Sequence, residues 1–150
     1  MEDLFDPATA EQFRQRIRSV TPESQRQWGK MSAAQMMEHC ARGLEMATGE
    51  LKPPRALIGR LLGRIVKPMV LKEGVPMRRN SPTAAALVVA PDADLEGSRT
   101  RLMGALERFV AGGERGCTDY AHSFFGALKP SEWSALMYKH LDHHLRQFGA

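Results

Sequence analysis

The most informative part of the sequence is its last stretch, Trp133 to Phe148, which reads W-S-A-L-M-Y-K-H-L-D-H-H-L-R-Q-F. At roughly 100° of rotation per residue in a helix, the apolar face of this stretch carries His140 and His144, one turn apart. His143 projects about 100° away from the centre of that face. Two imidazoles in an apolar stripe need polar partners, because an unpaired buried polar nitrogen costs roughly 1–3 kcal/mol. The i, i+4 spacing also converges two ring nitrogens, so a shared metal ion is one such partner.

The whole chain has the size and composition of one globular domain. It has 150 residues, of which 43% are hydrophobic, and we therefore expect a single domain over residues 1–150 with a sizeable core. No apolar run approaches the roughly 20 residues that span a bilayer, and the N-terminus lacks the pattern of a signal peptide. Two cysteines, Cys40 and Cys117, are too few for a disulfide framework. These features favour a reducing, cytoplasmic setting.

Positive charge is concentrated in one segment of the chain. Residues 52–79 contain eight basic residues against one acidic residue, Glu73, whereas the net charge of the whole chain is +4. A basic surface can attract nucleic acid, anionic lipid or acidic small molecules, or it can be a solvated face without a partner. The segment has no interleaved aromatic residues on which bases could stack, so we expect no nucleic-acid groove.

Capping residues and apolar periodicity predict four long helices, at about residues 7–20, 32–48, 95–111 and 130–148. Their predicted start signals are Asp6, Ser32, Asp92 or Asp94, and Pro130. A shorter amphipathic helix is expected at residues 55–66, packed as a lid over the long helices, with an amphipathic membrane-surface helix as the alternative. Residues 67–91 form a long connection, in which we expect 86–90 to be extended and to make a lone strand pairing. These elements predict an all-α chain, a helical bundle with a crossover insertion.

A metal bound by His140 and His144 needs a further ligand from another helix. His39 is the only other histidine on a predicted long helix, and it lies at the edge of that helix's apolar face. Facing helices of a bundle bring side chains to a common depth, which is how such cores hold metals. A lone histidine in this position is more often a hydrogen-bonded structural residue, and that reading stays open beside the metal site.

Three segments of the chain have a pattern in common with known proteins. They are W-G-K-M-S-A-A-Q-M-M-E-H-C at 28–40, R-N-S-P at 79–82, and the run from H-S-F-F-G-A-L-K-P-S-E-W to H-L-D-H-H-L-R-Q-F-G at 122–149. Together they resemble an uncharacterised bacterial family of the DinB/YfiT-like superfamily. The resemblance covers almost the whole chain. It implies an up-down-down-up four-helix bundle with a crossover insertion between the second and third helices, and a divalent metal held by His39, His140 and His144. Lys129 departs from the family pattern, which often has Ser or Thr there, but this concerns the start of the last helix.

The expected function is that of a metal-dependent enzyme with three histidine ligands and an open position for water or a thiolate. Zinc fits this ligand set best, although imidazoles alone do not distinguish it from nickel, iron or manganese. Better-known members of the superfamily are thiol-dependent, which implies a small-molecule substrate such as a low-molecular-weight thiol. The chemistry is then thiol transfer or metal-assisted hydrolysis. A homodimer agrees with the superfamily and with the leucine-rich helix at 57–66. The alternative is a non-catalytic metal-binding or stress-response protein whose fourth metal position is closed by a side chain.

His122 is the remaining candidate for chemistry, in the loop that leads into the last helix. In one reading it bonds the loop backbone. In the other, Phe124 and Phe125 anchor the loop so that His122 faces the open metal position as a catalytic acid or base, for which a near-neutral pKa is suitable. Without such a fold-back, His122 would lie some 12–18 Å from the metal, at about 5.4 Å per helical turn.

Overall fold

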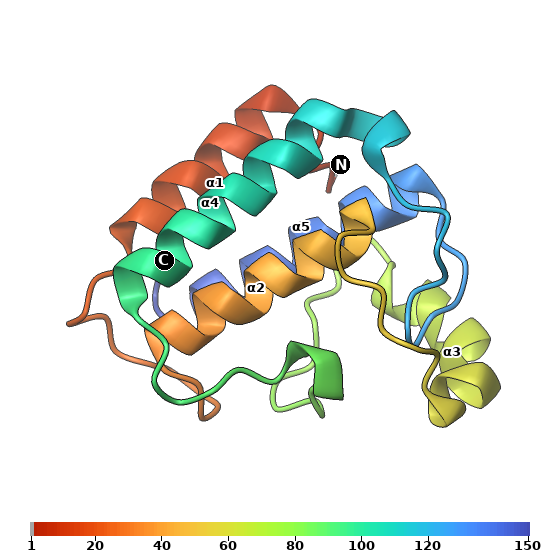
Figure 1. The fold of residues 1–150 in the computed structure, drawn as a ribbon, viewed down its shortest axis with the longest axis horizontal. Helices are drawn as coiled ribbons and strands as arrows, with labels where there is room; N and C mark the ends of the chain where they lie inside the picture. The colour runs from red at the N-terminus through yellow and green to blue at the C-terminus, as the bar shows by residue number, and fades with distance from the viewer. Residues whose placement is uncertain (1) are drawn as a thin grey trace.

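The computed structural model describes residues 2–150, and its regular structure is helical (Figure 1). Its five α-helices are α1 (Pro7–Ser19), α2 (Ala33–Thr48), α3 (Leu57–Val70), α4 (Leu95–Gly112) and α5 (Pro130–Arg146), with short 3-10 turns η1 (Ala85–Leu87) and η2 (Gly113–Gly116). Residues 2–150 form no strand beyond an isolated antiparallel bridge between His122 and Gly126. The predicted all-α class is confirmed. No helix in this part of the chain is long and apolar enough to cross a membrane.

The predicted cap residues start three of the long helices. The Asp6 side chain accepts a hydrogen bond from the Thr9 amide at 2.8 Å, at the start of α1. Ser32 and Gln35 form a reciprocal capping box at the start of α2. At the start of α4 the side chain of Asp94 is the cap. Each cap satisfies an amide that has no partner within its own helix, which is why these residues set the helix starts.

The last helix begins at Lys129 without a side-chain cap. Pro130 occupies the first helical position, where its missing N–H is not needed. The Glu132 carboxylate instead reaches back to accept a hydrogen bond from the Lys129 amide at 2.8 Å. It also pairs with Lys67 at 2.8 Å. The start of α5 is therefore held by Glu132 in place of a Ser or Thr cap.

The four long helices share one apolar core. In Figure 1, α1 and α4 lie side by side, and α2 and α5 lie side by side beneath them. Each helix of one pair contacts the other pair, with α2 against α4 and α1 against α5. The largest fully buried side chains are Leu4, Phe13, Ile17, Met36, Met37, Leu44, Leu102, Leu106, Phe109, Trp133, Leu141 and Leu145. The contact between α2 and α5 brings the histidines of these two helices together.

The short helix α3 does not lie over the long helices as a lid, so that expectation is wrong. It extends from Leu57 to Val70 and continues through Pro68. Its glycines, Gly59 and Gly63, lie against the backbone of Phe124 in the loop before α5. Figure 1 shows α3 at one edge of the molecule, beside this loop. Glycine at these two positions lets the backbones approach closely, and that contact holds α3 at the edge of the fold.

The connection at residues 71–94 contains no strand pairing, contrary to the expectation for 86–90. Residues 85–87 form a 3-10 turn, and α2 side chains bind the carbonyls that a partner strand would have used. Arg42 donates to the carbonyl of Ala86 at 3.3 Å and to that of Val88 at 2.7 Å. Gln35 donates to the carbonyl of Val89 at 3.1 Å. These bonds hold the connection against α2 beside His39.

Candidate metal centre

Three histidines from two helices converge on one point inside the fold. His39 comes from α2, and His140 and His144 come from successive turns of α5. One ring nitrogen from each lies within 4.8 Å of the others. The Nε2 atoms of His39 and His140 are 2.8 Å apart. The three ring centroids are separated by 4.6 to 4.8 Å. The structure thus brings together the three residues that the sequence predicted as metal ligands.

Hydrogen bonds on the outer nitrogens orient two of these rings. His39 Nδ1 lies 3.0 Å from the carbonyl oxygen of Leu87. Because a carbonyl only accepts, Nδ1 carries the hydrogen and Nε2 keeps its lone pair. His144 Nδ1 lies 3.0 Å from Gln147 Oε1, and the Gln147 amide is fixed by donation from its Nε2 to the Trp28 carbonyl at 2.7 Å. Both Nε2 lone pairs therefore point inward, the arrangement that metal-binding histidines use.

The third ring, His140, is positioned by the absence of a side chain opposite it. Gly43 lies on α2 one turn after His39, and a Cβ added there would lie 3.0 Å from both Cε1 and Nδ1 of His140. Any larger residue at this position would push the ring away from the cluster. In the metal-free protein the His39 proton sits on Nδ1, so His140 Nε2 donates the hydrogen bond between the two rings. Metal binding by both Nε2 atoms requires that this proton leave His140 Nε2.

Burial keeps the three imidazoles neutral, which is the form that binds metals. It lowers the pKa of His39 below its usual value, and the hydrogen bond to Leu87 only partly opposes this shift. Burial and then the neighbouring His39 and His144 hold the pKa of His140 well below its usual value. The pKa of His144 falls to about 3, mainly through burial and then through His39. At neutral pH none of these rings carries a second proton, so metal binding requires only that the proton on His140 leave its Nε2 atom.

The donor set and its compactness fit a divalent metal ion. Two nitrogens on one tetrahedral zinc lie about 3.3 Å apart, given a Zn–N distance of roughly 2.0–2.1 Å. The 2.8 Å between the Nε2 atoms of His39 and His140 is close to that separation. Within residues 2–150 the cluster contains only its three histidines, with no cysteine or carboxylate as a fourth member. All three histidines lie in largely buried surroundings. A fourth ligand would therefore have to come from outside this cluster.

Histidine 143 lies outside this cluster, as its helical phase predicted. Its ring packs against Trp28 with ring centroids 5.5 Å apart. The guanidinium group of Arg79 stacks on the same Trp28 ring, 4.0 Å from its centroid. His143 also lines a cavity of about 400 Å³ together with Arg78 and Lys139. Burial and then Arg79 lower the pKa of His143. His143 therefore helps to pack Trp28 and Arg79 against α5.

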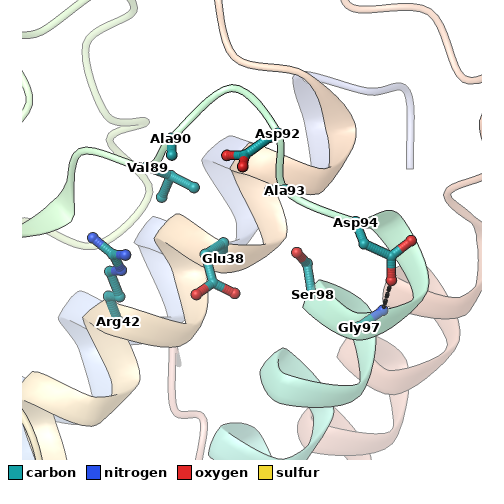
Figure 2. A pocket seen from close by; sticks show the side chains of 9 residues that line it. All are labelled: Glu38, Arg42, Val89, Ala90, Asp92, Ala93, Asp94, Gly97 and Ser98. Atoms are coloured by element: carbon teal, nitrogen blue, oxygen red, sulfur yellow. Dashed lines mark hydrogen bonds between the residues drawn. The ribbon is translucent and has the colours of Figure 1, made fainter.

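A second cavity, of about 320 Å³, borders α2 next to His39 but is not lined by any of the three histidines. Figure 2 shows Glu38 and Arg42 of α2 facing Asp92 and Ser98 across this hollow. The Arg42 guanidinium is engaged with the carbonyls of residues 86 and 88. Arg42, on one side of this cavity, therefore stabilises the connection whose Leu87 carbonyl accepts a hydrogen bond from His39.

The structure gives His122 a role in the loop before α5. Its Nδ1 accepts hydrogen bonds from the amides of Phe124 at 3.1 Å and Phe125 at 3.2 Å. Its ring stacks on Phe125 and packs against Trp133. Burial and the charge of Arg55 lower its pKa to about 4, so the near-neutral pKa expected for it is wrong. His122 is still close enough to His140 to contribute to the low pKa of that residue.

Sequence reasoning missed three residues that build the site. The role of Gln147 could have been predicted from the sequence, because it lies three residues after His144 on the same helix face and can bond to its ring. Gly43 has a weaker signal, because it lies four residues after His39 on α2. The Leu87 carbonyl has none, since any residue type could supply it and only the path of the connection places it at His39.

One comparison with known proteins places the chain in a family. A family described as protein of unknown function, DUF1569, matches residues 3–150. The chain belongs to the DUF1569 family. No curated protein and no solved structure matches it. For this DUF1569 protein the three-histidine cluster is thus the feature from which function must be argued.

Proposed function

We propose that this DUF1569 protein binds one divalent metal ion through His39, His140 and His144 and uses it in catalysis. The observation that carries the proposal is the inward orientation of the Nε2 lone pairs, set by the Leu87 carbonyl and the Gln147 amide. In a purely structural arrangement these histidines would be expected to bond to other groups of the protein and not to one another. Here His39 and His140 share one hydrogen bond and His144 lies beside them, and a cation is a partner that satisfies all three Nε2 atoms at once.

The proposed chemistry is thiol transfer or hydrolysis of a small molecule in a cytoplasmic setting. A divalent ion with three neutral ligands keeps its full charge and, when bound, lowers the pKa of a water or thiol beside it. Zinc is our preferred ion. The residues of the chain would hold the ion and keep its ligands neutral, and the cluster of the described residues supplies no fourth ligand that would compete with a substrate. The lack of a fourth cysteine, histidine or carboxylate in the cluster of the described residues favours this proposal over a non-catalytic metal-binding protein with a closed fourth position.

We further propose that His122 takes part as a neutral hydrogen-bond donor. Its Nδ1 is occupied by two backbone amides, so the ring proton lies on Nε2. With a pKa of about 4 the ring is neutral at physiological pH. Such a group can stabilise negative charge that develops on a substrate or leaving group. The variant His122→Asn keeps an acceptor for the two amides but loses the Nε2 donor, and it should lose turnover while retaining the metal.

The single-domain fold is proposed to be the up-down-down-up four-helix bundle of the DinB-like superfamily. The contacts of both α1 and α2 with both α4 and α5, of which that between α2 and α4 is the most extensive, support this assignment. The position of the long connection, which contains α3 and lies between α2 and α4, also supports it. In this arrangement one ligand comes from α2 and an H-x-x-x-H pair from α5, as the resemblance implies.

Metal content of variants tests the proposed ligands. The untagged protein, purified without chelator and dialysed against zinc, should hold one ion per chain. Replacing His39, His140 or His144 by Ala should each abolish this stoichiometric binding. His143→Ala is the matched control, because it removes a neighbouring histidine of the same helix and should retain the ion. Loss of zinc from His143→Ala, with retention in His144→Ala, would show that the ligand assignment is wrong.

Turnover separates the enzyme from the non-catalytic alternative. The zinc-loaded protein is assayed for conjugation of a small thiol, such as cysteine, to a fluorogenic alkyl halide, and for hydrolysis of activated esters and amides. A metal-dependent rate that disappears in His140→Ala supports the enzyme. A spectroscopically closed fourth position, filled by a protein side chain, would instead favour the alternative.

A further inference from the structure

Helix α3 exposes a continuous apolar stripe. Leu57 and Leu61 are each 78% exposed, and Ile65 and Met69 are each 67% exposed. Ile58 and Leu62 extend the same stripe. Isolated apolar residues are ordinary on protein surfaces, but a contiguous patch of large ones marks an interaction site. At about 100° per residue these side chains occupy one half of the helix circumference.

The fold prevents α3 from turning this stripe inward. Gly59 and Gly63 lie on the side of the helix roughly opposite the stripe, against the backbone of Phe124. A Cβ added to Gly59 would lie 2.6 Å from Phe124 Cα. In addition, the amide of Ala56 donates to the carbonyl of Ser123 at 2.9 Å just before the helix. The apolar side of α3 is therefore directed outward by close backbone contacts on its other side.

Unpaired cations flank the stripe. Arg60 and Arg64 are exposed and lie along one edge of it, and neither forms an ion pair within residues 2–150. Helix α3 contains no acidic residue, and Lys67, its other cation, pairs with Glu132. Lys52 just before the helix and Lys72 just after it are also exposed. The surface is thus apolar along its centre and cationic along one edge, and beyond its C-terminal end Lys72 is followed by the acidic Glu73.

We propose that α3 is a docking surface for anionic lipid membranes, on which it lies parallel to the bilayer plane. Interfacial helices combine a large apolar face with Lys and Arg beside it, and they bind through apolar burial together with attraction to anionic headgroups. The long side chains of Arg60 and Arg64 can reach the headgroups while the apolar side chains enter the acyl boundary. The position of α3 at one edge of the molecule leaves the stripe accessible to a flat surface (Figure 1).

Charge favours a bilayer over a second copy of the chain as the occupant. A symmetric contact between two α3 helices would bring the cations of both copies to one interface, with no acidic residue on α3 to pair with them. An anionic bilayer instead provides both an apolar interior and negative charge. The inference does not depend on the proposed metal function, because none of the metal-site residues belongs to α3.

Vesicle co-sedimentation of the full-length protein tests the proposal. Vesicles contain phosphatidylcholine alone, or phosphatidylcholine with about 30% phosphatidylserine, at about 100 mM salt. We expect binding to the anionic vesicles to be about tenfold tighter or more than to the neutral ones, and to weaken as salt rises. Leu61→Glu with Ile65→Glu should abolish binding, and Arg60→Glu with Arg64→Glu should remove the preference for anionic vesicles. Val88→Glu is the matched control, since Val88 is a 58% exposed apolar residue outside α3.

All replaced side chains are exposed, so unchanged circular dichroism and melting should show that the variants fold. The Arg60 and Arg64 variant keeps the apolar stripe and provides a second, independent comparison. Absence of binding to anionic vesicles would overturn the proposal. So would a concentration-dependent dimer, measured by analytical ultracentrifugation, that Leu61→Glu with Ile65→Glu dissociates while vesicles compete poorly for the same surface. That result would assign the stripe to a second copy.

Discussion

The low pKa of His122 predicts an acid sensitivity of folding that a single substitution removes. His122 has a pKa of about 4 in the folded protein, against about 6.5 in an unfolded chain. Between these values the unfolded chain binds more protons at this position than the folded protein. The free energy of unfolding therefore falls as the pH drops through 6.5 towards 4. Protonation of Nδ1 would also eliminate its two bonds from the amides of Phe124 and Phe125.

The size of the effect follows from the two pKa values. At pH 7 the difference in proton binding lowers the free energy of unfolding by only about 0.2 kcal/mol. At pH 5 the corresponding loss is about 2 kcal/mol, and near pH 4 it is on the order of 3 kcal/mol. In His122→Asn the amide oxygen accepts from the same backbone groups but does not titrate. Between pH 7 and pH 5 the variant should therefore lose about 2 kcal/mol less than the original protein.

Urea unfolding at pH 8, 7 and 5 measures this difference, with a chelator present so that metal release does not contribute. Other buried histidines also titrate on unfolding. His39 and His144 are the same in both proteins and cancel in the comparison, whereas His140, whose pKa His122 helps to lower, adds to the difference in the same direction. Between pH 8 and pH 7 the two proteins should show the same change, which serves as the control. Parallel losses of stability between pH 7 and pH 5, within about 0.5 kcal/mol, would refute the assignment of the low pKa to His122.

Three further substitutions probe how the site and α3 are held. Gln147→Met removes the acceptor for His144 Nδ1 and should weaken zinc binding about 10–100-fold by titration calorimetry; unchanged affinity would mean that Gln147 does not orient the ring. Gly43→Ala places a methyl group 3.0 Å from the His140 ring and should also weaken zinc binding, whereas Gly104→Ala in α4, which meets only the flexible end of Arg108, should not. Gly63→Ala drives a methyl group into the carbonyl of Phe124 and should speed amide exchange across residues 57–70, and equal exchange rates would show that this contact does not hold α3.

Much of the fold could be predicted from local sequence signals. Asp6 and Ser32 mark the starts of α1 and α2 because their side chains cap amides three residues away. Such bonds depend on residues that are close in the chain, so a pattern of neighbours reveals them. The helical phase of α5 likewise separates His140 and His144 from His143, because that separation depends only on 3.6 residues per turn.

The parts that could not be predicted depend on tertiary contacts. The expected strand at 86–90 is absent because Arg42 and Gln35, some fifty positions earlier, bind its carbonyls. The same contacts place the Leu87 carbonyl at His39, which no pattern of residue types encodes. The direction of α3 follows from the close approach of Gly59 to Phe124, and periodicity alone does not say which side of an amphipathic helix is covered. For His122 the sequence left two roles open, and its loop bonds are now defined.

The measurement that tests the metal centre most directly is a crystal structure of the zinc-loaded protein, with anomalous data on both sides of the zinc absorption edge. The geometry predicts a single strong anomalous peak bonded to Nε2 of His39, His140 and His144, with Nδ1 of His39 still on the Leu87 carbonyl and a fourth ligand that is not a protein side chain. An anomalous peak at His143, or zinc bound through fewer than these three histidines, would contradict the account.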